Sequence, residues 1–266
     1  MRQLQRIAIA EHTLAAIDGG RYVNAHDQVV EIADLVEAAK DGTVLHERRP
    51  RIAPARRFDS RIAVTGESTI EALVRLGDGP HLACLNFASA KNAGGGFLGG
   101  AQAQEETLAR SSGLYPCLLA QPAHYERNRA NRSPLYLDLA IFSPHVPFFR
   151  SDDGAWLDRP VLASVITCAA PNARALREHG ESDTTILEDT LRRRAAFVLA
   201  IAAHHGIERL VLGAWGAGVF GNDPALVADA FGTQLEGEYR GVFAEIVFAI
   251  HGGKGANHDA FVARFG

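Results

Sequence analysis

Three consecutive glycines and two adjacent glutamates, separated by a short spacer, are the residues of this sequence best suited to chemistry. Backbone without side chains lets a ligand approach closely, or takes φ values that other residues avoid. Paired carboxyl groups can supply the acid and the charge that cleave a glycosidic bond. The residues of this stretch that we expect at a binding or catalytic site are Asn92, Gly94, Gly95, Gly96, Gln104, Glu105 and Glu106.

Each half of this pattern is common by itself. A lone triple glycine is usually a surface turn, and a Glu-Glu pair often marks an exposed helix start, where the macrodipole favours anions. Here the glycines follow an apolar run and precede a helical pattern. Because ligands in α/β folds bind at the carboxyl ends of strands, the combination favours a ligand loop beside a pair of acids.

The chemistry of such a site depends on a protonated acid. Glycosidic cleavage passes through an oxocarbenium-like transition state, and the leaving oxygen needs a proton. Burial or a neighbouring carboxylate raises the pKa of a glutamic acid. We expect Phe97 and Leu98 to provide apolar surroundings for Glu106, and Glu105 to provide the neighbouring charge. A helix N-terminus at Gln104 opposes this effect because its dipole favours the ionised form.

A second glycine-rich stretch, residues 213–224, also follows a strand pattern and precedes a helix pattern. Gly216 to Gly221 matches G-x-G-x-x-G, but a Rossmann domain would need more strand–helix units than the residues that follow can form. Bare N–H groups beside a helix N-terminus form a cradle for anions. The stretch therefore predicts an anion-binding loop, with Asp223 capping a helix that starts at Pro224.

Strand and helix patterns alternate from residue 61 onward. The expected strands cover 62–65, 81–86, 135–142, 161–168, 209–214 and 245–250. Helices are expected over 69–76 and 186–205, and two more are expected to begin near 104 and near 224. Pro144, Pro147 and Pro160 are expected in a long link between two strands. This order predicts a three-layer α/β/α sandwich.

The first 60 residues have a different pattern. Apolar residues recur at helical spacing over 4–14 and again over 32–39, with a short strand pattern at 21–23 and an exposed connector over 48–57. We predict a mainly helical N-terminal extension, 1–60, packed on a catalytic domain that spans 61–266.

Composition excludes several classes of protein. The chain of 266 residues is 47% hydrophobic and 22% charged, as in an ordinary globular protein. It shows neither a signal-peptide pattern nor an apolar run long enough to span a membrane. Three widely spaced cysteines predict neither a disulfide framework nor a zinc site. We expect a cytoplasmic protein that uses neither a metal nor a redox cofactor.

Charge limits the expected partners. The formal net charge is −4, and no basic face of the kind that grips nucleic acid is evident. We interpret Arg192-Arg193-Arg194 as a solvated helix face. We therefore expect no direct grip on nucleic acid and no membrane contact, and a polyanionic substrate would be held by one terminal unit.

The glycine and glutamate pattern resembles the catalytic loop of poly(ADP-ribose) glycohydrolases of the compact microbial type, which are built on a macrodomain. Supporting likeness extends over nearly the whole chain, for example Thr13-Leu14 near the start and Val64-Thr65 in the first strand of the core. The resemblance implies a macrodomain-like fold with a mixed central sheet.

The resemblance also implies roles for single residues. Glu106 would protonate the leaving group and later activate water, while Glu105 and Asn92 would hold ribose hydroxyls. Gln104 would orient the glutamate pair or the ribose. The positions that would wrap the diphosphate are Gly216, Ala217, Gly218, Val219 and Phe220. Phe220 would stack on the ligand, although a plain core role for it remains open.

The implied function is cleavage of ribose–ribose bonds in poly(ADP-ribose), mainly from the chain end, with release of ADP-ribose. The resemblance also implies that ADP-ribosylated proteins are the substrates and that the enzyme acts in the response to DNA damage. One alternative is removal of single ADP-ribose units from protein or nucleic acid. Another is a non-catalytic module that binds ADP-ribose. The paired acids favour an enzyme, because a binding module has no use for them.

Overall fold

The computed structural model describes residues 1–266 except 53–56, 78–80 and 181–183. A seven-stranded sheet forms its centre, in the order β3-β6-β7-β5-β8-β9-β4. The strands are β1 (Arg21–Val23), β2 (Val29–Glu31), β3 (Val44–His46), β4 (Arg61–Thr65), β5 (Leu82–Phe87), β6 (Ala140–Arg150), β7 (Trp156–Cys168), β8 (Arg209–Leu212) and β9 (Glu245–Ala249). Within the seven-stranded sheet β6 runs antiparallel to β3 and β7, and the remaining pairs are parallel. β1 and β2 form a separate antiparallel pair. The predicted mixed sheet is confirmed.

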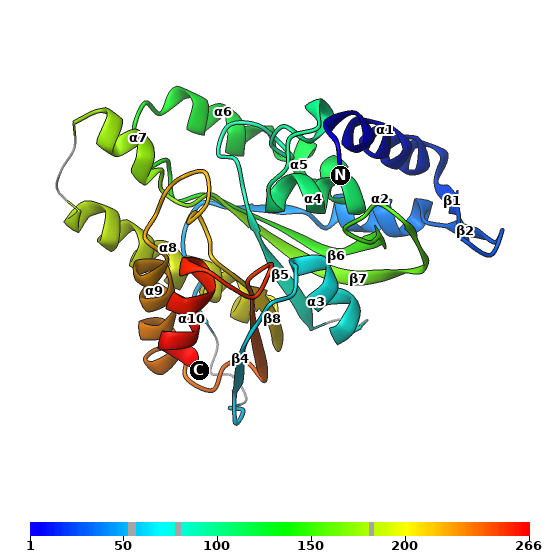
Figure 1. The fold of residues 1–266 in the computed structure, drawn as a ribbon. Coiled ribbons are helices and arrows are strands. Elements are labelled where there is room, and N and C mark those ends of the chain that lie inside the picture. The colour runs from blue at the N-terminus through cyan, green and yellow to red at the C-terminus, as the bar shows by residue number, and fades with distance from the viewer. Residues whose placement is uncertain (53–56, 78–80, 181–183) are drawn as a thin grey trace.

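Helices cover both faces of this sheet (Figure 1). They are α1 (Gln3–Gly19), α2 (Ala33–Asp41), α3 (Thr69–Leu76), α4 (Gln104–Ser111), α5 (Leu114–Leu119), α6 (Pro122–Ala130), α7 (Ala173–Glu178), α8 (Thr185–His204), α9 (Pro224–Glu236) and α10 (Ala256–Phe265). Side chains alternate along β5, so Leu82 and Cys84 pack with α3 and α5 while Ala83 and Leu85 pack with α8 and α9. The three-layer arrangement is therefore the predicted one.

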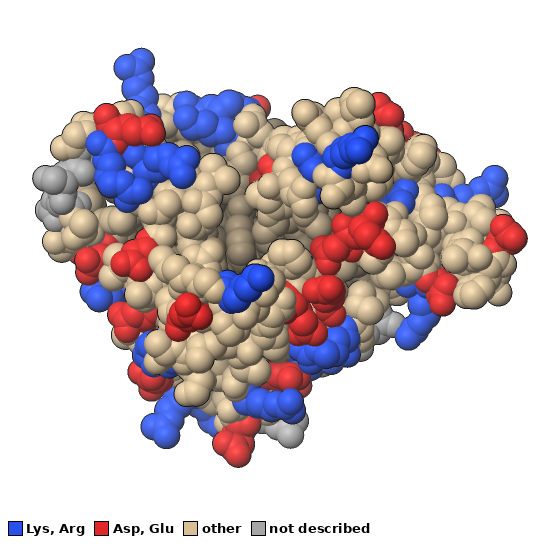
Figure 2. All heavy atoms as spheres, in the orientation of Figure 1, with Lys and Arg blue, Asp and Glu red and all other residues tan. Residues whose placement is uncertain are grey.

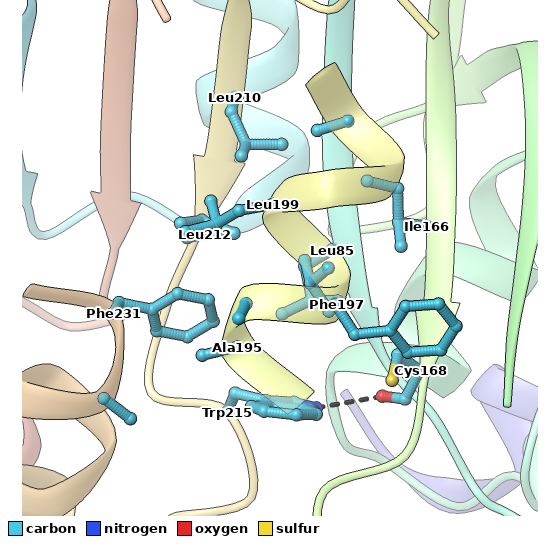
Figure 3. Close-up of a cluster of buried hydrophobic side chains, with 14 of the residues drawn as sticks. Leu85, Ile166, Cys168, Ala195, Phe197, Leu199, Leu210, Leu212, Trp215 and Phe231 are labelled. Carbon is cyan, nitrogen blue, oxygen red and sulfur yellow. Dashed lines mark hydrogen bonds between the residues drawn. The ribbon is translucent and has the colours of Figure 1, made fainter. Parts of the chain in front are cut away.

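The larger core lies under α8. Figure 3 shows Phe197 and Leu199 of this helix packed among side chains of the sheet, with Trp215 below them. The Trp215 indole N–H donates to the carbonyl oxygen of Cys168 at 2.9 Å, which satisfies its one polar group inside the core. This contact anchors the start of the second glycine-rich stretch, which follows β8 and contains Trp215.

The first residues form the expected helices but also extend the sheet. β3 pairs with β6 through Val44 and Phe142, so the sheet crosses the division that we predict at residue 60. Helix α1 lies along α4, and the Thr13 hydroxyl donates to the Arg110 carbonyl oxygen at 2.6 Å. Of the predicted connector, residues 53–56 lie outside the described residues. The two-domain division stays a prediction.

The prediction of a proline-rich link was wrong. Pro144 and Pro147 lie inside β6, and Pro160 lies inside β7. β3 pairs only with residues 140–142 of β6, and β5 pairs only with residues 164–168 of β7. Pro144 and Pro160 therefore lie where their strand has a partner on one side, and a missing N–H leaves the ladder intact there. Beside Pro147 the second side of β6 holds an isolated bridge from Ser112 to Phe148, and the Pro147 carbonyl oxygen accepts from the Gly113 N–H at 2.9 Å.

The strand predicted at 135–142 starts late, at Ala140, because a buried arginine organises the residues before it. Arg194 is fully buried. Its guanidinium donates to Asp138 and to the carbonyl oxygens of Leu135 and Ala169, each at 2.9 Å. The interpretation of all three arginines as a solvated face was thus wrong for Arg194. Successive residues on a helix point about 100° apart, so one of the three faces inward.

Candidate active site

A cavity of about 460 Å³ opens where the carboxyl ends of β5, β8 and β9 meet the N-terminal ends of α3 and α4. Figure 2 shows a deep hollow near the middle of the corresponding face. The residues that line the cavity are Ser68, Thr69, Ile70, Phe87, Gln102, Ala103, Gln104, Thr107, Leu108, Asp152, Ala214, Gly216, Gly218, Val219, Phe220, Ala249, Ile250, His251 and Asn257. This position is where ligands bind in open α/β sheets.

The triple glycine lies against the two glutamates. Gly94 and Gly95 have φ values of 69° and 59°, in the left-handed region that favours glycine. A Cβ atom on Gly95 would lie 3.0 Å from the Glu106 carboxyl carbon and 3.1 Å from Glu105 Oε2, and would overlap Glu106 Oε1. The bare backbone at Gly95 is thus needed for both carboxyl groups to approach the loop.

Glu105 is held beneath this loop. It is buried, and its carboxylate accepts hydrogen bonds from the Ser89 N–H at 2.6 Å and from the Asn86 side chain at 3.4 Å. Burial, with the nearby charge of Glu106 as a lesser cause, raises the pKa of Glu105 to about 8. Burial at this position therefore favours the protonated form of Glu105.

Glu106 is half-buried, and its Oε1 accepts a hydrogen bond from the Gly96 N–H at 3.0 Å. The apolar surroundings expected for it lie elsewhere. Phe97 packs with Ala10 and Ala109, while Leu98 is 48% exposed. The deeper position in the first turn of α4 belongs to Glu105, which is buried.

Gln104 connects elements of the framework. Its side-chain oxygen accepts from the Phe87 N–H at 2.8 Å, and its amide group donates to the Leu85 carbonyl oxygen at 2.8 Å and to the Thr69 hydroxyl at 3.2 Å. These bonds fix the start of α4 to the end of β5 and the start of α3. Gln104 thereby orients the helix turn that carries both glutamates.

Helix α1 braces the same loop from outside. The Gln3 side chain donates to the Gly99 carbonyl oxygen at 2.9 Å, and Arg6 donates to that of Gly100 at 2.7 Å. Gly100 has a φ of 72°, and a Cβ there would meet Gln3 and Ile7 at 2.8–2.9 Å. The N-terminal segment thus holds the loop that positions the acids.

The second glycine-rich stretch forms the opposite wall of the cavity. Gly216 has a φ of 74°, and its carbonyl oxygen accepts from the Asn222 side chain at 3.2 Å. A Cβ on Gly218 would meet no atom within 4 Å, so its backbone faces free space. Asp223 caps α9 by accepting from the Ala225 N–H at 2.8 Å, as predicted.

The position of Phe220 is compatible with both roles considered for it, stacking on a ligand and packing in the core. It lines the cavity, and it also packs against the larger core. Its ring centre lies 5.9 Å from that of Tyr136, a separation typical of aromatic pairs. Its accessible face is the one that a ligand in the cavity would meet.

The structure divides the predicted residues into two groups. The lining includes Gln104, Gly216, Gly218, Val219 and Phe220. It does not include Asn92, Gly94, Gly95, Gly96, Glu105, Glu106 or Ala217. The glutamates lie between lining residues Gln104 and Thr107 on α4, and Asn92 is exposed on the glycine loop. The acid loop therefore borders the cavity at one end.

Sequence reasoning missed Asp152, which lines the cavity from the hairpin between β6 and β7. Its carboxylate accepts a short hydrogen bond from the Ser68 hydroxyl, and burial raises its pKa. His251 and Asn257 lie on the same cavity. No local motif marks Asp152. Its position depends on the hairpin between β6 and β7, and we predicted an irregular link in place of this hairpin.

Comparisons with known proteins show the family to which the chain is related. A sequence model of the family described as microbial-type PARG, catalytic domain, matches residues 10–151. The crystal structure of poly(ADP-ribose) glycohydrolase from Thermomonospora curvata shares 47% identity over 98% of this chain and 99% of that chain, with a TM-score of 0.92. The chain belongs to this family. Its activity is that of a poly(ADP-ribose) glycohydrolase, a glycosyl hydrolase that acts on poly(ADP-ribose).

Two further structures of the family contain ligands. The Thermomonospora curvata enzyme bound to the inhibitor ADP-HPD shares 46% identity over 98% of this chain and 99% of that chain, with a TM-score of 0.89. The Deinococcus radiodurans enzyme in complex with ADP-ribose shares 44% identity over 86% of this chain and 96% of that chain, with a TM-score of 0.79. No curated protein sequence matched the chain.

The protonation of Glu105 gives a test in this glycohydrolase that is independent of activity. The pKa of Glu105 lies near 8 in the folded protein against an ordinary value of 4.5. Its contribution to stability is therefore complete below about pH 4.5 and declines as the pH rises through 8, by up to roughly 1.4 kcal/mol per unit. Glu105→Gln keeps the shape but cannot ionise.

Thermal unfolding at about pH 5 and about pH 8.5 should therefore show the melting temperature of Glu105→Gln gaining on that of the wild type at the higher pH. Glu11→Gln, on an exposed position of α1, is the control and should show no such gain. An offset between Glu105→Gln and the wild type that is the same at both pH values would contradict the buried, protonated state.

Proposed function

We propose that the enzyme removes ADP-ribose from the end of poly(ADP-ribose), with the terminal unit in the cavity and the scissile bond at Glu106. The observation that carries this proposal is the contact of a side-chain-free loop with two carboxyl groups at one end of a ligand-sized cavity. The related enzymes solved with ADP-ribose and with ADP-HPD support the choice of ligand.

In this proposal Glu106 transfers the proton. Its Oε2 carries no hydrogen bond among the described residues, whereas the carboxylate of Glu105 is held by Ser89 and Asn86. Protonated Glu106 donates to the leaving ribose oxygen as the bond from that oxygen to the anomeric carbon breaks. The resulting carboxylate then takes a proton from water, whose oxygen bonds to the anomeric carbon. Free ADP-ribose is the product.

The remaining predicted residues hold the substrate. Glu105 and Asn92 bind ribose hydroxyls, and the stretch from Gly216 through Ala217 and Gly218 to Val219 wraps the diphosphate with its backbone N–H groups. Phe220 packs on the ligand. Val219 is 67% exposed, as suits a residue that a bound ligand covers.

The reaction written in this way uses neither a metal nor a redox cofactor. Among the described residues no group of three or more His, Cys, Asp or Glu side chains is arranged to hold a metal ion. No helix in the described part of the chain is long and apolar enough to cross a membrane. Its three cysteines are buried and unpaired, which supports placing the enzyme in the cytoplasm. ADP-ribosylated proteins would be its substrates.

Product analysis tests the proposal. Purified polymer, incubated with the enzyme and separated by size, should release free ADP-ribose from the first time points while the remaining chains shorten gradually. Early appearance of short oligomers would show internal cleavage in place of attack at the end. Unchanged polymer would favour a binding module. Release of ADP-ribose only from singly modified proteins would favour the mono-ADP-ribosyl hydrolase alternative.

A further inference from the structure

Four exposed arginines gather on one face beside the cavity. They are Arg129 on α6, Arg132 after it, and Arg174 and Arg177 on α7. Figure 2 shows basic side chains collected over the position of these two helices in Figure 1, at the edge of the hollow. We call these four residues the outer basic surface. The sequence did not reveal it, because its members come from separate segments.

Backbone hydrogen bonds bring these segments together. The Asn172 N–H at the start of α7 donates to the Pro134 carbonyl oxygen at 2.9 Å, so the residues after α6 lie against the start of α7. Arg132 precedes Pro134 by two positions, and Arg174 follows Asn172 by two. The segments that carry Arg132 and Arg174 therefore lie against each other.

The outer basic surface is tied to both loops of the active site. Arg129 donates to the carbonyl oxygen of Lys91, next to Asn92, at 2.6 Å. Arg177 donates to the carbonyl oxygen of Gly221 at 3.3 Å, and the Arg174 N–H donates to that of Phe220 at 2.9 Å. Residues of this surface therefore contact segments next to both loops.

The arginines of this surface form no ion pairs within the described part of the chain. Among the residues that the structure describes, none of the four guanidinium groups forms an ion pair with a carboxylate. Glu126 and Glu178 on the same helices are the nearest acids in sequence. The whole chain carries a net charge of −4, so this concentration of positive charge is local and suits an anionic partner.

We propose that the outer basic surface binds the diphosphate groups of the polymer that follow the unit held in the cavity. This inference rests on the proposed function. When the terminal unit is cleaved, the leaving group is the rest of the polymer, and it departs from the end of the cavity that Glu106 borders. Each further unit carries a diphosphate, and Arg pairs with such oxygens through its planar fork.

If so, the enzyme should bind long polymer more tightly than it binds ADP-ribose alone. Each phosphate contact on a flexible anionic chain adds about 0.7 to the slope of log affinity against log salt concentration. Binding of long polymer should therefore depend more steeply on salt than binding of ADP-ribose. The outer contacts would also keep a shortened chain near the site after each cut.

Charge reversal of two arginines tests the proposal. Arg132 and Arg174 are chosen because no hydrogen bond of their side chains appears among the described residues, so their replacement leaves the bracing by Arg129 and Arg177 in place. The double variant Arg132→Glu/Arg174→Glu is compared with Arg21→Glu/Arg61→Glu. This control pair lies on exposed positions of β1 and β4, away from α6 and α7 in Figure 1.

The measurements are the KM and kcat for long polymer and the Kd for ADP-ribose, at two salt concentrations. We expect the KM of the Arg132→Glu/Arg174→Glu variant to rise about 10-fold and its salt slope to fall by about 1.4, which is about 0.7 for each of the two lost contacts. Its kcat and its Kd for ADP-ribose should match those of the control pair. Loss of polymer hydrolysis or of ADP-ribose binding in the wild type would instead count against the proposed function itself.

Three results would overturn the proposal. An equal KM in both double variants would show that the surface does not touch the polymer. A parallel rise in the Kd for ADP-ribose would show that the arginines act on the cavity. A single-stranded oligodeoxynucleotide of equal charge could also compete with polymer for the enzyme. If it competed as strongly as unlabelled polymer, and if this competition were lost in the Arg132→Glu/Arg174→Glu variant, the surface would be assigned to nucleic acid.

Discussion

Replacing Glu106 by glutamine should lower the kcat for poly(ADP-ribose) by roughly 10²–10⁴-fold, the usual worth of a general acid, while ADP-ribose affinity stays within about twofold. The reason is geometric. Glutamine can still accept the hydrogen bond from the Gly96 N–H, so the loop keeps its conformation, but the side chain has no proton to give. Single-turnover rates with purified polymer and calorimetry with ADP-ribose measure the two quantities.

Two controls make this result specific. Glu11→Gln introduces the same change on an exposed part of α1 and should retain full activity. Glu105→Gln should weaken ribose binding as well as turnover, because its carboxylate is fixed by Ser89 and Asn86. Near-normal hydrolysis by Glu106→Gln would reject the assignment. A pure loss of turnover in Glu105→Gln, with Glu106→Gln active, would exchange the two roles.

Gly95→Ala should lower turnover by about 100-fold while costing only about 1–2 kcal/mol of stability. The φ of 59° strains any residue with a Cβ. The added atom also overlaps Glu106 Oε1 and approaches Glu105 Oε2 to 3.1 Å. Because the Glu106 carboxyl group ends a flexible side chain, it moves aside, and the acid leaves its place at the scissile bond.

Two other glycines separate the causes of this effect. Gly77→Ala, with a φ of 71° and no described residue within 4 Å of its Cβ, introduces backbone strain without such an overlap. Gly99→Ala, also with nothing within 4 Å, carries neither strain nor overlap although it lies in the same loop. Both should keep wild-type turnover. Gly77→Ala should lose at least as much stability as Gly95→Ala, because a φ of 71° with a ψ of −177° is open essentially to glycine alone. Full activity in Gly95→Ala would show that the contact with the glutamates has no role in catalysis.

Much of the fold was predictable because local signals agreed with one another. The capping box at Ser68 starts α3 at Thr69, and the Asp223-Pro224 pair starts α9. The glycine run marked backbone that both glutamates approach, since no other residue type fits at Gly95. These features are local in sequence, so the sequence pattern contains the information that fixes them.

Features that depend on distant partners were not predictable in this way. Pro144 and Pro160 looked like breakers, but each lies where its strand lacks a second neighbour. Arg194 looked solvated because its partners, from Leu135 to Ala169, come together only in the fold. The same limit applied to the acids. Adjacent glutamates look alike in sequence, and burial against β5 distinguishes Glu105 from Glu106.

The contribution of β3 to the central sheet has a consequence for the evolution and engineering of this enzyme. The chain cannot be trimmed to a minimal catalytic core at residue 60, because Ala140, Ile141 and Phe142 would lose their hydrogen-bonding neighbour. A bared row of peptide groups recruits foreign strands, and the shortened protein would tend to self-associate. Any smaller descendant would have to acquire a substitute for that strand before discarding the helices that precede it.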